Sequence, residues 1–152
     1  MEINVLVDDG IALRLAWLEG LARQVLAAEK AGPGVELGLY ITRENRVREL
    51  NRIYRGIDEP TDVLAFAAEE SDAALFVTPP DGVQHLGEVI ISYPQAVMQA
   101  EEQQYPVEQE IALLIVHGVL HLLGYDHDGS EPESRMKARE AQILSSIEGG
   151  AA

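Results

Sequence analysis

The sequence predicts an α/β fold in which a small, mixed and partly parallel four-stranded sheet packs with about five helices. The chain begins with a strand-like, a helical and a second strand-like segment, the order of a parallel βαβ unit. Most of the second half has the apolar spacing of helices. A chain of 152 residues with 47% hydrophobic residues can fill one core. We therefore expect residues 1–152 to form one domain, with a frayed tail at 149–152.

The predicted βαβ unit occupies the first quarter of the chain. Residues 2–7 alternate between polar and apolar side chains, as a half-buried strand does. Residues 11–30 are rich in Leu and Ala at helical spacing and stop before a Gly-Pro-Gly turn. Residues 35–41 have the composition of a second strand.

A helix that is rich in arginine is predicted next, over residues 43–54, with Thr42 as its N-cap. Its inward stripe is expected to comprise Val47, Leu50 and Tyr54. Five of the eleven Lys and Arg residues lie in this region: Arg43, Arg46, Arg48, Arg52 and Arg55. Arg48, Arg52 and Arg55 share a face away from that stripe, which is either a solvated surface or the approach for an anionic ligand.

The remaining elements alternate less regularly. Short strands are predicted at 62–66 and 86–92, separated by a loop over 67–84. Three helices follow, starting near Pro94 and covering 106–123 and 131–147. The helix over 106–123 is apolar on almost every side after Glu110, so we expect it to be central and buried.

Composition excludes several classes of protein. No run of about 18 apolar residues is present, which argues against a membrane span, and the first residues lack the pattern of a signal peptide. The absence of cysteine excludes disulfides, Cys-ligated zinc and thiol catalysis. A cytoplasmic location is therefore expected. The net charge of -15 contrasts with the basic surface usual in nonspecific nucleic-acid binders.

The main chemical signal is a histidine motif with the spacing H-x-x-x-H-x-x-G-x-x-H, formed by His117, His121, Gly124 and His127. Residues four apart on a helix share a face, so His117 and His121 should project together. Gly124 can end the helix in a left-handed conformation and turn His127 back toward them. Three imidazoles that leave one position to water are typical of a catalytic zinc site. Ordinary core histidines are the alternative interpretation.

This spacing is the zinc-binding pattern of metzincin proteases, but the residue after the first histidine is Gly118 instead of the general-base glutamate. Asp126 and Asp128 flank the third histidine, and either one orients a ligand imidazole or both shape the turn. Met136 is expected in the core rather than beneath a metal, and His85 on the surface in a loop.

Two segments together resemble the signatures of the YbeY family of bacterial endoribonucleases: residues 50–66 and residues 117–127. Residues 86–92 are similar to the strand between them in that family. The resemblance implies one zinc ion held by His117, His121 and His127, and a functionally required Arg55. It further implies cleavage of single-stranded RNA in the maturation of the 16S rRNA 3′ end and in ribosome quality control. The small ribosomal subunit or its assembly factors are the implied partners, and no DNA is expected.

These residues suggest a mechanism and leave alternatives. Zinc lowers the pKa of its water to about 7, which would compensate for the missing glutamate. Arg55 would stabilise charge on the phosphoryl oxygens; otherwise it forms a salt bridge with Asp58 or Glu59. A metallopeptidase remains an alternative because of the ligand spacing. A ribosome-assembly binding protein with a structural metal is another.

Overall fold

The structure is a computed structural model that describes residues 1–32, 34–67, 84–124 and 130–150. In this part of the chain the strands and helices are, in order, β1 Glu2–Val7, α1 Leu15–Ala28, β2 Val35–Thr42, α2 Glu44–Arg55, β3 Val63–Ala67, β4 Gln84–Ser92, α3 Tyr93–Gln103, α4 Val107–Leu122 and α5 Ser130–Gly150. The four strands form one sheet in the order β1-β2-β4-β3. Strand β2 is parallel to both of its neighbours, β1 and β4, whereas β3 runs antiparallel to β4. The predicted mixed α/β class is confirmed.

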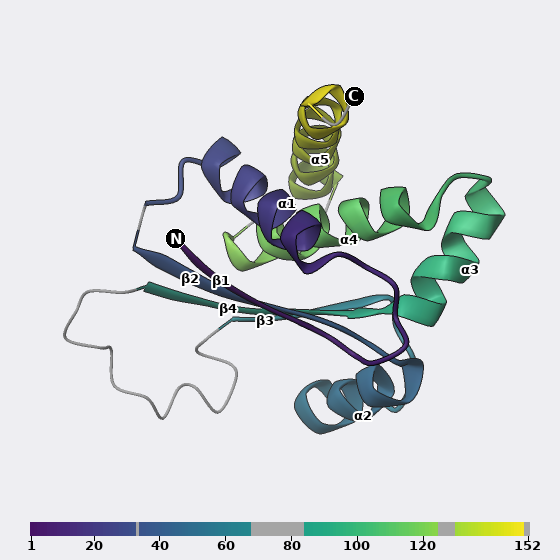
Figure 1. Cartoon of the computed structure of the whole chain (residues 1–152). Coiled ribbons are helices and arrows are strands. Elements are labelled where there is room, and N and C mark those ends of the chain that lie inside the picture. The colour runs from purple at the N-terminus through teal and green to yellow at the C-terminus, as the bar shows by residue number, and fades with distance from the viewer. Residues whose placement is uncertain (33, 68–83, 125–129, 151–152) are drawn as a thin grey trace.

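The two faces of the sheet are covered unequally. Helices α1, α4 and α5 lie on one side, α2 lies on the other, and α3 stands at one end of the sheet (Figure 1). Strand β2 shows why: Val35, Leu37, Leu39 and Ile41 are buried and belong to the large core cluster. A separate small cluster on the α2 side comprises Val47, Leu64, Phe66 and Ile90. The apolar alternation of the strands therefore builds one large core and one small one.

Helix α4 is the buried helix of the large core, as predicted. Nine of its residues are buried: Glu110, Ile111, Ala112, Leu114, Ile115, Val116, Gly118, Val119 and Leu120. The single carboxylate among them is satisfied, because the Glu110 oxygens accept hydrogen bonds from the Tyr105 hydroxyl and, at 2.7 Å, from Gln99 Nε2. Burial of the Tyr105 hydroxyl and its hydrogen bond to Glu110 raise the pKa of Tyr105 to about 12.

Gly118 allows α4 to lie directly on strand β4. A Cβ atom at this position would come within 2.6 Å of Val89 Cγ1 and 3.0 Å of Val89 Cγ2. Such distances are well inside van der Waals contact, so glycine is required here for packing. The closeness matters for function because His117 precedes Gly118 on the same helix.

Some predicted details are wrong. Arg43, not Thr42, occupies the N-cap of α2, and it makes no capping bond through its side chain. The Thr42 hydroxyl instead donates to the carboxylate of Asp8, which also accepts from Tyr40. The bond from Thr42 is the main reason that the pKa of Asp8 is lowered. Tyr54 is 40% exposed rather than inward.

The predicted boundaries also need small corrections. Helix α1 begins at Leu15, later than predicted, and α5 continues through Gly150, so part of the expected tail is helical. Residues 151–152 and most of the predicted 67–84 loop (68–83) lie outside the described residues. Among the described helices, none has both the length and the apolar content that crossing a membrane requires.

Candidate active site

His117 and His121 of α4 line a hollow of about 230 Å³ together with Arg55 of α2. Its other lining residues are Gly118 and the segment Val63–Ala65 of β3. The two histidines are four residues apart, so one turn of helix puts both at the same hollow. Two of the predicted metal-binding side chains and the predicted arginine are therefore brought together from segments far apart in the sequence.

Helix α4 ends where the motif predicts. The helix ends at Leu122, and Gly124 has a φ of +103°, a conformation that L side chains rarely adopt. The Gly124 amide donates to the His121 carbonyl at 3.1 Å. The helix end and the positive φ predicted for Gly124 are thus confirmed, whereas the return of the chain toward the two histidines stays a prediction. His127, Asp126 and Asp128 lie outside the described residues, and their predicted roles stay predictions.

A carboxylate from α5 contacts His117. The distance from His117 Nδ1 to Glu140 Oε1 is 2.6 Å. This hydrogen bond raises the pKa of His117 above its ordinary value, although burial alone would lower it. The negative charges of Glu140 and Asp62 act in the same upward direction. The contact with Glu140 is made by Nδ1, and the two ring nitrogens of the imidazole therefore have different surroundings.

Sequence reasoning missed Glu140, although the sequence contains a signal. Glu140 follows Met136 by four residues and precedes Ile143 by three, and both of these neighbours are almost fully buried. A carboxylate on the buried stripe of an amphipathic helix requires a polar partner. The core position expected for Met136 is also confirmed, since it is 1% exposed.

Arg55 is the last residue of α2 and is held by strand β3. Gly56, with a φ of 72°, ends the helix directly after it. The Arg55 Nη2 atom donates to the carbonyl of Ala65 at 2.8 Å, and its guanidinium lies 5.2 Å from the centre of the Phe66 ring. Tyr54 contacts the same ring, with 5.1 Å between the ring centroids. These contacts direct the guanidinium at the hollow that contains the histidines.

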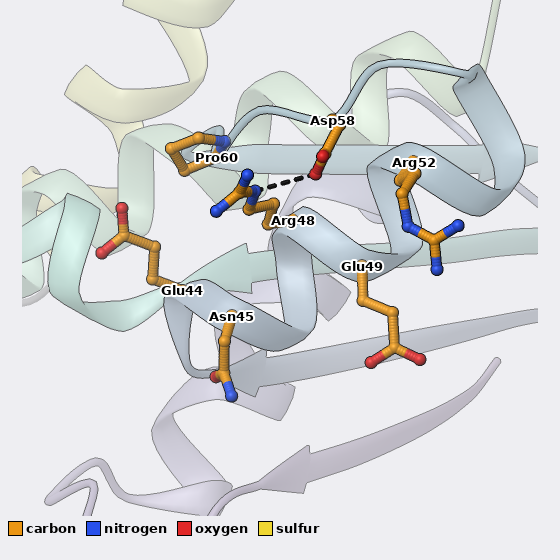
Figure 2. Close-up of a pocket in the computed structure, with 7 residues that line it drawn as sticks. All are labelled: Glu44, Asn45, Arg48, Glu49, Arg52, Asp58 and Pro60. Carbon is orange, nitrogen blue, oxygen red and sulfur yellow. Dashed lines mark hydrogen bonds and ion pairs between the residues drawn. The ribbon is translucent and has the colours of Figure 1, made fainter.

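A larger hollow of about 560 Å³ lies on α2 and the segment that follows it. It is lined by Glu44, Asn45, Arg48, Glu49, Arg52, Asp58 and Pro60 (Figure 2). Arg48 Nε donates to Asp58 at 2.8 Å, and both side chains are more than half exposed. Asp58, one of the two acids considered as partners for Arg55, thus binds Arg48. Three acids and two arginines line this hollow, a charge balance that does not favour an anion.

His85 is on the surface, as predicted, but in strand β4 rather than in a loop. Its Nδ1 lies 3.0 Å from Glu36 Oε1 on the neighbouring strand β2. Neither His85 nor Glu36 lines the hollow that contains His117.

The donors that the structure places fit two positions of a zinc site. Imidazole is a common zinc ligand, and a ligand imidazole usually donates its other N–H to a carboxylate, as His117 can to Glu140. Within residues 1–32, 34–67, 84–124 and 130–150, no group of three or more His, Cys, Asp or Glu side chains is arranged to hold a metal. The third predicted ligand, His127, lies outside the described residues, so the described residues fit two of the three predicted ligands.

Comparisons with known proteins identify one family that matches most of the chain. The family model described as endoribonuclease YbeY matches residues 11–148. An endoribonuclease YbeY of Dehalococcoides mccartyi is 48% identical over 148 residues, which cover 92% of this chain and 86% of that protein. One of Chloroflexus aggregans is 42% identical, with 95% of each chain covered.

A solved structure shows the same fold. The solution structure of a Thermotoga maritima protein superimposes with a TM-score of 0.60 and covers 97% of this chain and 93% of that one, at 24% identity. The family match spans nearly the whole chain and includes the helix with His117 and His121 and the strand that holds Arg55. This chain belongs to the YbeY endoribonuclease family.

Proposed function

We propose that this chain is a zinc-dependent endoribonuclease that cuts single-stranded RNA. The observation that carries the proposal is the convergence of His117, His121 and Arg55 on one hollow. Imidazoles suit a divalent cation, and a guanidinium suits a phosphate, so this combination matches the two charges of a metal-assisted phosphodiester reaction. Membership of a family whose relatives are named endoribonucleases supports the same reaction.

Each residue has a separate task in this proposal. His117 and His121, together with the predicted His127, would hold the ion. Zinc, when bound, supplies Lewis acidity that brings the pKa of a coordinated water to about 7. Arg55 would donate to the phosphoryl oxygens and stabilise the negative charge that builds up on them during cleavage. The Ala65 carbonyl and the Phe66 ring hold its guanidinium in advance, which reduces the cost of ordering it when RNA binds.

The proposed substrate is ribosomal RNA, with maturation of the 16S rRNA 3′ end and ribosome quality control as the roles. A net charge of -15 opposes tight binding of free RNA, because RNA is itself a polyanion. The arginines attract RNA only at short range, whereas the net charge of the chain repels it at longer range. Delivery of the RNA by the small ribosomal subunit or by an assembly factor would overcome this repulsion.

The test combines metal analysis with RNA cleavage. Wild type should contain close to one zinc per chain and cut a labelled single-stranded RNA. His117→Ala should lose both zinc and cleavage, whereas Arg55→Ala should keep zinc and lose most cleavage. Metal-loaded wild type that leaves RNA intact, alone and with small ribosomal subunits, would contradict the nuclease proposal and favour a binding protein with a structural metal.

The metallopeptidase alternative has no support in the geometry. Its general base would be a glutamate at position 118, but the space around Gly118 on the sheet side is filled by Val89. A carboxylate cannot be introduced there without moving α4 away from β4. The ligand spacing shared with metzincins is therefore accompanied by packing that excludes the peptidase base.

A further inference from the structure

We propose that Glu140 is a positioning residue for His117, fixing the imidazole so that Nδ1 carries its hydrogen and Nε2 faces the metal. The orientation of Nε2 toward a cation rests on the proposed zinc function. The choice of tautomer does not, because it concerns the metal-free chain. Glu140 belongs to α5 and reaches His117 from outside the hollow, because no described residue of α5 is part of the lining.

The contact is short and sheltered. His117 Nδ1 and Glu140 Oε1 are 2.6 Å apart, and the Glu140 side chain is only 13% exposed. An ionised carboxylate accepts hydrogen bonds and cannot donate them, so a neutral His117 satisfies it by placing the hydrogen on Nδ1. In this tautomer the ring's in-plane lone pair is on Nε2. Loss of the carboxylate removes this selection.

Glu140 cannot easily move away, because α5 is anchored on both sides of it. Met136 and Ile143, at 1% and 2% exposure, hold the same stripe of α5 in the core. The adjacent Arg139 donates to the Ala28 carbonyl at 2.7 Å and pairs with Glu29, both at the end of α1. These contacts fix the rotation of α5 about its axis and its position along that axis. They therefore fix where the Glu140 carboxylate meets His117.

A structural role alone would give a different pattern from a positioning role. If Glu140 only tied α5 to α4, its loss would lower stability without changing which ring nitrogen carries hydrogen. If it positions the ring, the tautomer changes and zinc affinity falls. Outer partners of metal-bound histidines typically contribute about 10–100-fold to metal affinity.

The test uses the full chain and three variants. Glu140→Ala removes the acceptor, Glu140→Gln keeps an oxygen that can accept from Nδ1, and Glu108→Ala is a control at an exposed glutamate of α4. Nitrogen-15 NMR of metal-free protein, at a pH well above the imidazole range, identifies the His117 tautomer. Competition with a chromophoric chelator measures zinc affinity, and urea unfolding measures stability.

We expect wild type, Glu140→Gln and Glu108→Ala to hold the Nδ1–H tautomer, and Glu140→Ala to lose it. Zinc affinity should fall by about 10–100-fold in Glu140→Ala and by less in Glu140→Gln. An unchanged tautomer in a folded Glu140→Ala would overturn the inference. Wild type that fails to bind zinc would overturn the proposed function and the metal half of the inference, while the tautomer result would still decide the role of Glu140 on the ring.

Discussion

The two hollows beside α2 differ in a way that their sizes do not predict. The larger, about 560 Å³, is lined by three acids and two arginines, of which Arg48 and Asp58 pair with each other (Figure 2). The smaller, about 230 Å³, combines Arg55 with His117 and His121, and none of the described residues that line it is an acid. Volume alone would direct attention to the first hollow. The set of side chains directs it to the second.

This difference shows how one helix serves two purposes. The middle of α2 turns Arg48 toward the loop that follows, where the exposed ion pair contributes little. The end of α2 turns Arg55 toward β3, where a carbonyl and an aromatic ring hold it beside the histidines. Arg48 is therefore paired with an acid at the surface, whereas Arg55 lies at the hollow that contains the histidines.

The largest effect is expected from His121→Ala, which removes an imidazole from the small hollow. We expect zinc content to fall close to zero and RNA cleavage to be lost, a larger effect than the about 10–100-fold caused by loss of an outer partner. Metal analysis after gel filtration measures the first and a labelled RNA assay the second. Replacing His85, which pairs with Glu36 away from this hollow, should leave zinc content unchanged.

Arg55→Ala should lower the cleavage rate by about 100–1,000-fold, the range found when one donor to a developing oxyanion is removed. Zinc content should remain that of wild type. The matched variant is Arg52→Ala, three residues earlier on the same helix, which should change the rate only a few-fold. Equal losses in the two variants would mean that α2 acts as a general cationic surface and not through one positioned guanidinium.

Gly118→Ala should destabilise the chain by about 1–3 kcal/mol, the usual cost of overpacking, because the new methyl group meets Val89. Urea unfolding provides the measurement. Gly20→Ala is the control: it lies within α1 with no atom within 4 Å of the added Cβ, and should stabilise by about 0.5–1 kcal/mol. A stability gain at both positions would show that α4 is free to move from β4.

The pH dependence of metal-free protein should reveal the His117–Glu140 pair. The pKa of folded His117 is raised, so the pair's contribution is fully present below the unfolded value, about 6.5, and is lost as pH rises through the folded value. The stability difference between wild type and Glu140→Gln should accordingly shrink as pH rises through that window. Urea unfolding at several pH values tests this, and a growing difference would reverse the sign assigned to the pair.

The smallest effect is expected from Arg48→Ala, which breaks the exposed pair with Asp58 in the large hollow. Exposed ion pairs contribute at most about 1 kcal/mol, so both stability and cleavage should stay near wild type. A cleavage loss comparable to that of Arg55→Ala would assign the large hollow to RNA binding and remove the contrast between the two hollows.

Local patterns were sufficient for much of the fold. Alternation in β2 and helical spacing in α4 depend on neighbours in the chain, so the strands, the helices and the shared face of His117 and His121 follow from the sequence. Contacts between distant segments of the chain could not be predicted from these local patterns. Thr42 could cap α2, but Asp8, 34 residues earlier, takes its hydroxyl. Glu140 reaches His117 across 23 residues, and which acid Arg48 would bind depended on the path of the loop after α2.

The direction of α4 has a consequence for the charge of its ligand. Its backbone carbonyls point toward the carboxyl end, and the last of them carry a partial negative charge equivalent to about half an electron. His121 lies in the last turn of this 16-residue helix. A cation held there would be favoured by the helix dipole as well as by its ligands, whereas an anion would be disfavoured. The buried helix thus makes the electrostatic potential near His121 more favourable to positive charge.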